Sequence, residues 1–267
     1  VLGTENSTHI VEPEFKIDDK KLPELEAAME RLKKMEPVQY VLGHTEFYGR
    51  TFKVDPAVLI PRPETELLCR DAIKLGMRVY RMRSPYGKNA EPVRILDLCT
   101  GSGCIAWTME LSIPGSRVTA VDISDAALEV AAGQDFAAEL KSKETFKPEF
   151  IKADVLDSEQ EIELGPFDMV LSNPPYIMES EKEDMRRNVL EYEPESALFV
   201  PDDDPLLFYR AIARWSQRFM SPDGVGLSEV NETLARQTET VFKAAGYAHT
   251  EIVRDLSDKN RYIIYHK

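Results

Sequence analysis

The sequence predicts an α/β fold with a mostly parallel sheet, and three observations lead to this prediction. From about Val93 onwards, short apolar runs alternate with helical segments, which is the pattern of strand–helix–strand units in a parallel sheet. Near the C-terminus, two further strand-like runs are joined by a polar turn, which predicts an antiparallel hairpin that closes the sheet. With 43% apolar and 30% charged residues, the 267-residue chain has the composition of a globular protein.

The second part of the chain provides seven predicted strands and the helices between them. The strand-like runs are residues 93–96, 117–121, 149–153, 167–171, 225–230, 251–254 and 261–265. The helical runs are residues 104–111, 124–140, 205–220 and 232–245. Ser124 is placed to cap the second of these helices at its N-terminus, and Gly246 is placed to end the last one. The result is a seven-stranded mixed sheet whose last strand is antiparallel.

The first 90 residues follow a different pattern and predict a small helical and hairpin region. Apolar residues repeat at helical spacing between residues 22 and 35 and fall on one face: Leu22, Leu25, Ala28, Met29 and Leu32. Aromatic and β-branched residues then predict a hairpin at 39–54, with turns at Gly43 and Gly49.

A connecting loop and helix are predicted at 59–75, and a stretch rich in Arg, Pro, Gly and Asn predicts a linker at 80–91. We therefore expect three parts in the chain. They are a short N-terminal helical region at 1–36, a hairpin with its connecting loop and helix at 37–90, and the main α/β domain at 91–267.

The charge of the chain argues against long contacts with nucleic acid. The formal net charge is −14, whereas binding to a nucleic-acid backbone relies on Lys and Arg. Between residues 157 and 195, twelve acidic residues stand against three basic ones. No apolar stretch approaches the roughly 18 residues that span a bilayer, and residues 1–9 lack the features of a signal peptide. We expect a cytoplasmic protein, or one of an organellar matrix if a leader has been removed.

The three cysteines, Cys69, Cys99 and Cys104, are odd in number and widely spaced in apolar surroundings. This pattern favours free thiols with a structural role in a reducing compartment. With four His and no close Cys/His pairs, the chain gives little support to a zinc site, and we expect no metal.

The most informative motif is Asn173-Pro174-Pro175-Tyr176, which directly follows the apolar run 167–172. The two prolines fix two φ angles and remove two backbone donors, so they hold the Asn side chain and the neighbouring carbonyls rigidly. The Asn oxygen and a fixed carbonyl can together accept both hydrogens of a planar NH₂ group, while Tyr176 offers an aromatic wall. The motif therefore predicts an amide or an exocyclic amine as the substrate group.

A second motif lies between the first strand of the sheet and its first helix. It is Asp97-Leu98-Cys99-Thr100-Gly101-Ser102-Gly103. Its small residues let the backbone approach a ligand, and the following helix presents unpaired N–H groups. Asp122 ends the next strand, where an acidic side chain can hold two ribose hydroxyls. The combination predicts a cofactor that contains adenosine.

Dinucleotides and S-adenosylmethionine share this binding geometry. A dinucleotide site usually has glycines around a pyrophosphate, whereas Asp97 would repel phosphate and suits a cationic ammonium group. S-adenosylmethionine therefore fits better. Asp154, at the end of the third strand, is placed to accept from the adenine amine, and Val155 to pack on the ring; a cap or turn is the alternative role for Asp154.

The motifs together resemble the protein-glutamine N-methyltransferases that modify peptide-chain release factors, the HemK/PrmC family. The matching blocks are residues 37–43, 47–49, 59–66, 97–106, 120–122, 172–177 and 192–194. The Pro-Arg-Pro-Glu-Thr-Glu block at 61–66, joined to Asn-Pro-Pro-Tyr, is highly specific, whereas Asn-Pro-Pro-Tyr alone is shared with adenine-amino DNA methyltransferases.

The resemblance implies a Rossmann-like class I S-adenosylmethionine-dependent methyltransferase fold, with release factors as protein substrates. It implies that residues 99–103, Asp122, Asp154, Val155 and Asn173 line the cofactor pocket, and that residues 173–176 hold the substrate glutamine. Arg62 and Glu66 are expected to order a loop that covers the site, with a surface ion pair as the alternative.

Two other functions remain open from the sequence. DNA adenine methylation would need a target-recognition region and basic grooves, and neither is visible. A noncatalytic S-adenosylmethionine-binding module would not need the intact Asn-Pro-Pro-Tyr clamp.

Overall fold

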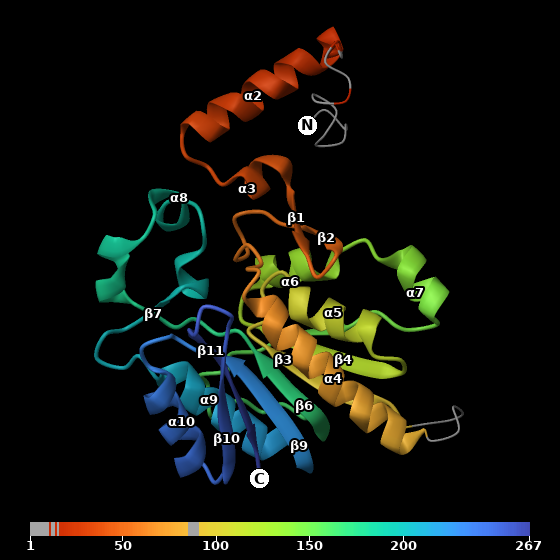
Figure 1. The fold of residues 1–267 in the computed structure, drawn as a ribbon, viewed down its shortest axis with the longest axis vertical. Coiled ribbons are helices and arrows are strands. Elements are labelled where there is room, and N and C mark those ends of the chain that lie inside the picture. Colours follow the sequence, from red (N-terminus) through yellow and green to blue (C-terminus); the bar gives the residue numbers. More distant parts are fainter. Residues whose placement is uncertain (1–10, 12–13, 15, 85–90) are drawn as a thin grey trace.

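A computed structural model of the chain describes residues 11, 14, 16–84 and 91–267. Its centre is a seven-stranded sheet in the order β10-β11-β9-β6-β3-β4-β5 (Figure 1). The strands of this sheet are β3 (Val93–Leu98), β4 (Ser116–Asp122), β5 (Glu149–Lys152), β6 (Phe167–Ser172), β9 (Met220–Glu229), β10 (His249–Arg254) and β11 (Asn260–His266). All seven predicted strands are confirmed, although β9 begins five residues earlier than predicted.

The parallel strands end together at one edge of the sheet. Leu98, the last residue of β3, pairs with Val121 in β4 and with Ser172 in β6, so the segments that follow these strands start side by side. The chain order reverses between β3 and β6, because β4 and β5 extend the sheet on one side and β6 on the other. Ligands of open α/β sheets bind at such a reversal point, outside the carboxyl ends of the strands.

The last strand, β11, is antiparallel to both of its neighbours, β9 and β10, as predicted. Tyr265 of β11 is paired with Gly226 of β9, and its ring occupies the space beside the glycine. A Cβ atom at position 226 would lie 1.9 Å from Tyr265 Cζ, so a glycine is required there. The Tyr265 ring also stacks on Phe242 at a centroid distance of 4.0 Å.

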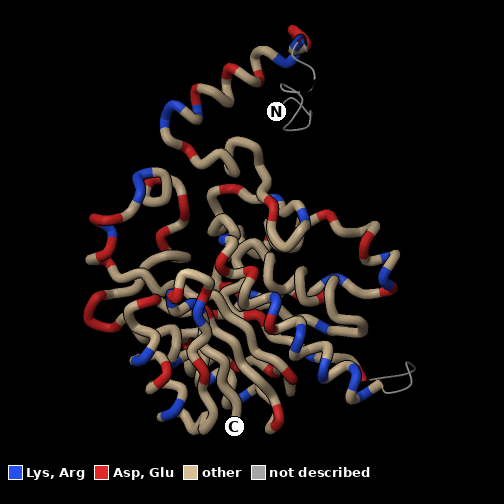
Figure 2. The backbone as a smooth tube through the Cα atoms, in the orientation of Figure 1, with Lys and Arg blue, Asp and Glu red and all other residues tan. Residues whose placement is uncertain are grey.

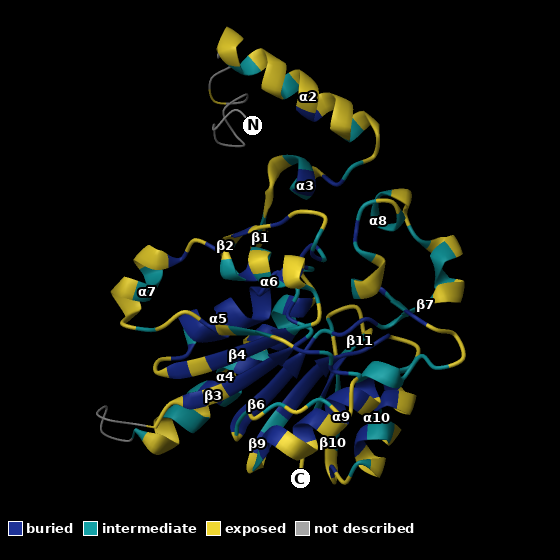
Figure 3. Ribbon diagram, turned by 180° about the vertical axis from the view of Figure 1, so that it is seen from behind, coloured by how far each residue is buried: buried dark blue, intermediate teal, exposed yellow. Residues whose placement is uncertain are grey.

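Helices cover both faces of the sheet. They are α4 (Thr65–Arg83), α5 (Cys104–Ser112), α6 (Asp125–Ala132), α7 (Ala137–Lys143), α9 (Leu207–Phe219) and α10 (Ala235–Ala244). The side chains of a strand alternate between faces. Ile95 and Met169 accordingly join the core beneath α4 and α5, while Leu96 and Val170 join the core beneath α9 and α10. Figure 3 shows the resulting buried centre between exposed outer helix faces.

The N-terminal part consists of short elements that extend away from the sheet (Figure 1). They are η1 (Asp19–Lys21), α2 (Leu22–Lys33), α3 (Val38–Leu42), β1 (His44–Phe47) and β2 (Arg50–Lys53). The predicted helix at 22–35 is present, but Ala28 is its one buried residue. The hairpin predicted at 39–54 is wrong in its first residues, because residues 38–42 form a helical turn. Gly43 ends this turn at φ 75°.

The loop and helix predicted at 59–75 are present, with a loop before α4, but the helix spans Thr65–Arg83 and so ends eight residues later than predicted. Pro61 and Pro63 keep the first part of this stretch in a loop, because a proline disfavours helical backbone in the residue before it. The linker predicted at 80–91 is likewise wrong at its beginning, where residues 80–83 are helical. Its residues 85–90 lie outside the described residues.

The single helix predicted at 124–140 is two helices, α6 and α7. Ser124 caps α6 as predicted and accepts a hydrogen bond from the Ala127 amide. The break follows Gly133, where the Gln134 side chain is buried. Gln134 accepts from the Lys53 amide and donates to the Lys53 and Ser102 carbonyls, and these bonds fix a non-helical segment. The helix predicted at 232–245 begins only at Ala235.

An irregular segment connects β6 to α9 beside the carboxyl edge of the sheet. Its elements are β7 (Ile177–Met178), η2 (Glu179–Asp184), α8 (Arg187–Leu190), η3 (Glu195–Ala197) and β8 (Phe199–Val200). Many acidic residues lie along it (Figure 2). Among the described residues, no helix is both long enough and apolar enough to cross a bilayer.

Candidate active site

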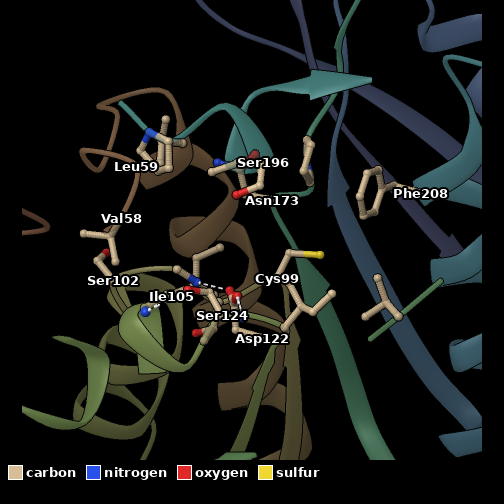
Figure 4. A pocket seen from close by; sticks show the side chains of 18 of the residues that line it. Val58, Leu59, Cys99, Ser102, Ile105, Asp122, Ser124, Asn173, Ser196 and Phe208 are labelled. Carbon is tan, nitrogen blue, oxygen red and sulfur yellow. Dashed lines mark hydrogen bonds between the residues drawn. The ribbon is translucent and has the colours of Figure 1, made fainter. Parts of the chain in front are cut away.

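A cavity of about 390 Å³ lies at the carboxyl edge of the sheet, at the reversal point between β3 and β6. This volume is within the range of small-molecule sites. The segments after β3, β4, β5 and β6 line it, and the close view in Figure 4 shows Cys99, Asp122 and Asn173 from three of these segments. Ala57–Arg62 and Pro194–Pro201 contribute its outer walls, together with Phe208 at the start of α9.

The loop after β3 approaches the cavity with its backbone. Gly101 has φ +53°, and no atom lies within 4 Å of the place where its Cβ would be, so the loop leaves open space there. Gly103, which caps α5 at φ +78°, is close to Ala131 and is not in the cavity wall. Cys99 also has a positive φ of 59°, which is uncommon for a residue with a Cβ. Its sulfur faces the cavity in Figure 4.

Asp97 lies below this loop and outside the cavity wall. Its side chain is fully buried, and Oδ2 accepts hydrogen bonds from Thr100 Oγ1 at 2.6 Å and from the Ala106 amide at 3.2 Å. Oδ1 has no partner among the described residues. Burial raises the pKa of Asp97 to about 7. Of the two described residues that donate to Asp97, Thr100 lines the cavity and Ala106 does not.

Asp122 and Asp154 stand at the cavity ends of β4 and β5. Asp122 Oδ2 accepts from the Gly101 amide at 2.8 Å, and Oδ1 accepts from the Ser124 amide at 3.0 Å. Burial raises the pKa of Asp122. Asp154 accepts from the Leu156 amide at 2.8 Å, which is the bond of a turn residue, and it also lines the cavity. The two roles that the sequence offers for Asp154 are therefore compatible. Val155 follows it in the wall.

The Asn-Pro-Pro-Tyr segment follows β6. Asn173 and Pro175 line the cavity, whereas Pro174 and Tyr176 lie behind the wall. Asn173 Nδ2 donates to Thr65 Oγ1 at 3.3 Å. Its Oδ1 has no hydrogen-bond donor among the described residues, so it is available to a ligand. Asn231 Nδ2 holds the segment from behind through a 3.1 Å bond to the Tyr176 carbonyl.

Thr65 and Glu229 are site residues that the sequence analysis missed. Glu229 ends β9 and is buried, and its two oxygens accept from Thr65 Oγ1 at 2.7 Å and from the Tyr176 hydroxyl at 3.0 Å. Burial raises the pKa of Glu229. A carboxylate at the end of an apolar strand was the available signal, but its partners are distant in sequence.

Arg62 and Glu66 have separate roles and do not pair with each other. Arg62 lines the cavity and donates to Glu193 Oε1 at 2.6 Å. Glu66 lies outside the cavity wall and accepts from the Tyr48 amide at 2.8 Å, which ties α4 to the β1–β2 turn. The alternative of a surface ion pair between Arg62 and Glu66 is therefore wrong.

The fold and the site together define a class I methyltransferase. The chain matches the methyltransferase small domain family over residues 86–193 and the PrmC N-terminal domain family over residues 1–43. Its fold is similar to the hMettl16 catalytic domain solved with an MAT2A 3′UTR hairpin. The TM-score is 0.61 at 12% identity, covering 86% of this chain and 81% of that one.

Two bacterial relatives narrow this class. The chain is 39% identical to a release factor glutamine methyltransferase of Bacteroides thetaiotaomicron, over 89% of this chain and 78% of the relative. It is 36% identical to the release factor glutamine methyltransferase of Flavobacterium psychrophilum, over 95% of this chain and 84% of the relative. The chain belongs to the release factor glutamine methyltransferase family, and it is a methyltransferase.

Proposed function

We propose that this protein transfers a methyl group from S-adenosylmethionine to the side-chain amide nitrogen of a glutamine in a peptide-chain release factor. The observation that carries the proposal is the orientation of Asn173. Its Nδ2 is engaged by Thr65 at 3.3 Å, which leaves the acceptor Oδ1 for a substrate NH₂ group at the cavity. Family membership supports the same substrate.

The residues around the cavity fit S-adenosylmethionine in size and in chemistry. Asp122 would accept from the ribose hydroxyls, because each of its oxygens has a lone pair left beyond the one backbone amide it binds. Asp154 would accept from the adenine amine, and the apolar side chain of Val155 would pack on the ring. The open backbone of residues 99–102 would accommodate the amino-acid part.

Asp97 acts differently in this proposal from what the sequence predicts. Because its carboxyl group is buried and bonded to Thr100, it would shape the loop rather than touch the ammonium group directly. Gly103 would likewise act by close packing of α5 against Ala131. Arg62 would border the substrate at the outer wall.

The substrate clamp would work by positioning. A glutamine amide nitrogen is a weak nucleophile because its lone pair is delocalised into the carbonyl group. Asn173 Oδ1 would accept one amide hydrogen, and the Pro174 carbonyl is the predicted second acceptor, although Pro174 is not among the residues that line the cavity. Together the two acceptors would orient the nitrogen and stabilise the positive charge that develops on it. The two prolines limit the motion of both acceptors, and the Tyr176 side chain supports them from behind the wall.

S-adenosylmethionine, when bound, supplies a methyl group on a positively charged sulfur, which becomes a neutral thioether after transfer. Transfer would exchange the S–CH₃ bond for an N–CH₃ bond, and one amide proton would be released to water. The acidic residues along the segment from β7 to β8 disfavour a nucleic-acid strand beside this cavity (Figure 2).

The test is a methyl-transfer assay with labelled S-adenosylmethionine and two acceptors, a peptide-chain release factor and duplex DNA. We expect label on a release-factor glutamine, located by mass spectrometry of the digested acceptor, and none on DNA. Label on adenine would show the wrong substrate class. Binding of the cofactor with no transfer to either acceptor would favour a noncatalytic module.

A further inference from the structure

Four polar side chains, two of which line the cavity, form one continuous set of hydrogen bonds. Tyr176 and Thr65 both donate to Glu229, and Asn173 donates to Thr65. The distances are 3.0 Å, 2.7 Å and 3.3 Å in that order. The residues come from three separate parts of the fold: the end of β9, the start of α4 and the segment after β6, which contributes two of them.

The direction of these bonds is fixed as long as Glu229 is ionised, which requires a pH above its pKa, and burial raises that pKa. An ionised carboxylate only accepts hydrogen bonds, and a threonine hydroxyl has a single hydrogen to donate. Because Thr65 gives that hydrogen to Glu229, its oxygen can offer only lone pairs to Asn173. The NH₂ end of the Asn173 amide must then face Thr65, and the oxygen end must face away from it.

We propose that Glu229 and Thr65 are positioning residues that set the orientation of the Asn173 amide, so that Oδ1 is presented to the substrate. This proposal rests on the proposed function for its substrate. We call the bonds from Asn173 to Thr65 and from Thr65 to Glu229 the relay. Without the relay, the Asn173 amide could turn by 180° and present two hydrogens where the substrate NH₂ group needs an acceptor. Donor would then face donor, and the clamp would repel the group it is built to hold.

The location of Glu229 supports this role. Glu229 is 4% exposed, and its side-chain hydrogen bonds in the described residues go to Thr65 and Tyr176. Burial of a carboxyl group costs free energy unless donors surround it. Both donors here belong to the site, since Thr65 lines the cavity and Tyr176 follows the clamp.

The chain contains a matched control for a purely structural role. Glu110 is 2% exposed and also accepts from a threonine hydroxyl, that of Thr145, and from the Val118 amide. Neither Glu110 nor Thr145 lines the cavity. Substitutions in this pair remove a half-buried bond between a threonine hydroxyl and a buried glutamate without touching Asn173.

The experiment compares Thr65→Val, Thr65→Ser and Glu229→Gln with Glu110→Gln and Thr145→Val, using the full chain and a release factor. We expect Thr65→Val to lower kcat by about 10²-fold, with cofactor affinity within about threefold of wild type. Thr65→Ser keeps the hydroxyl and should retain most activity. Glu229→Gln should lose about tenfold, because a glutamine can present either end to Thr65. The control variants should keep the wild-type kcat per folded molecule.

A double-mutant cycle with Asn173→Ala separates positioning from stability. If Thr65 acts through Asn173, Thr65→Val has no further effect on kcat once Asn173 is Ala. Additive losses would overturn the proposal, as would wild-type kcat in Thr65→Val. If Thr65→Val does not fold, Glu229→Gln replaces it in the same cycle.

A measurement without turnover keeps the test independent of the substrate. The side-chain NH₂ signal of Asn173, assigned by its loss in Asn173→Ala, should exchange with solvent more slowly in wild type than in Thr65→Val. Equal exchange rates would overturn the relay whatever the protein methylates. Slow exchange in a wild-type protein that leaves release factors unmodified would instead overturn the proposed function alone.

Discussion

Arg62 Nη2 lies 2.6 Å from Glu193 Oε1, and this ion pair joins two walls of the cavity that are 131 residues apart in the chain. Glu193 is buried, and its second oxygen accepts from the Ile60 amide at 3.1 Å. One carboxylate therefore holds the loop before α4 at two points. The pair closes the outer side of the cavity over the strand ends.

Removing Arg62 should destabilise the folded protein, because the ion pair between Arg62 and Glu193 joins two walls of the cavity. In Arg62→Ala, the buried Glu193 carboxylate keeps one backbone donor and loses its cation. We expect the free energy of unfolding to fall by about 1–3 kcal/mol, measured by urea titration, and cofactor affinity to weaken. Arg187→Ala, which breaks an exposed pair with Glu191, serves as the control and should change neither quantity. An Arg62→Ala protein with unchanged stability and affinity would contradict the closing role.

Asn173→Ala should affect the transition state more than the binding of the cofactor. It removes an acceptor aimed at developing positive charge, so kcat on a release-factor glutamine should fall by about 10²–10³-fold. Asn173→Asp keeps an acceptor and should retain partial activity. Single-turnover kinetics and calorimetry measure the two effects. Equal turnover by wild type and Asn173→Ala would refute the clamp.

Asp122→Ala should weaken the binding of S-adenosylmethionine. Losing hydrogen bonds to a charged acceptor costs about 1.5–3 kcal/mol, which corresponds to roughly tenfold or more in affinity. Calorimetry gives the dissociation constant directly. Asp125→Ala is a suitable control, because Asp125 pairs on the surface with Lys152. An Asp122→Ala protein that binds as tightly as wild type would show that the ribose lies elsewhere.

Asp97 should make stability depend on pH. Burial raises its pKa to about 7 in the folded state, whereas an unfolded Asp titrates near 3.8. The folded state therefore binds more protons between these values, and the contribution of Asp97 to the free energy of unfolding falls as pH rises from about 4 to about 7. Urea titrations of wild type and Asp97→Asn across this range isolate the effect. Relative to wild type, Asp97→Asn should gain stability as pH rises, and parallel curves would exclude the shift.

The strands were the part of the fold most accessible from sequence, because each is a short apolar run bounded by polar residues. Helix ends were harder to predict. The residues around Gln134 continue a helical pattern, but the Gln134 side chain binds the backbone of Lys53, 81 residues away. A contact of that kind leaves no local signal. Propensity then predicts one helix where tertiary hydrogen bonds impose two.

The residues of the candidate site also fall into two groups, those that could be predicted from the sequence and those that could not. Gly101, Asp122 and Asn173 could be found because each lies within a few residues of the end of a predicted strand, and parallel strands end at a common edge. Thr65 and Glu229 could not, since their bond joins residues 164 positions apart. The position of Asp97 below the loop also depends on packing that spacing does not encode.

The contact between Gly226 and Tyr265 constrains the order in which this sequence can change. A side chain at position 226 would overlap the Tyr265 ring, so a first substitution there breaks the pairing of β9 with β11. Replacing Tyr265 first leaves a hole beside Phe242 that a larger residue at 226 can then fill. The two positions are therefore expected to change together, with Tyr265 replaced by a smaller residue before Gly226 acquires a side chain.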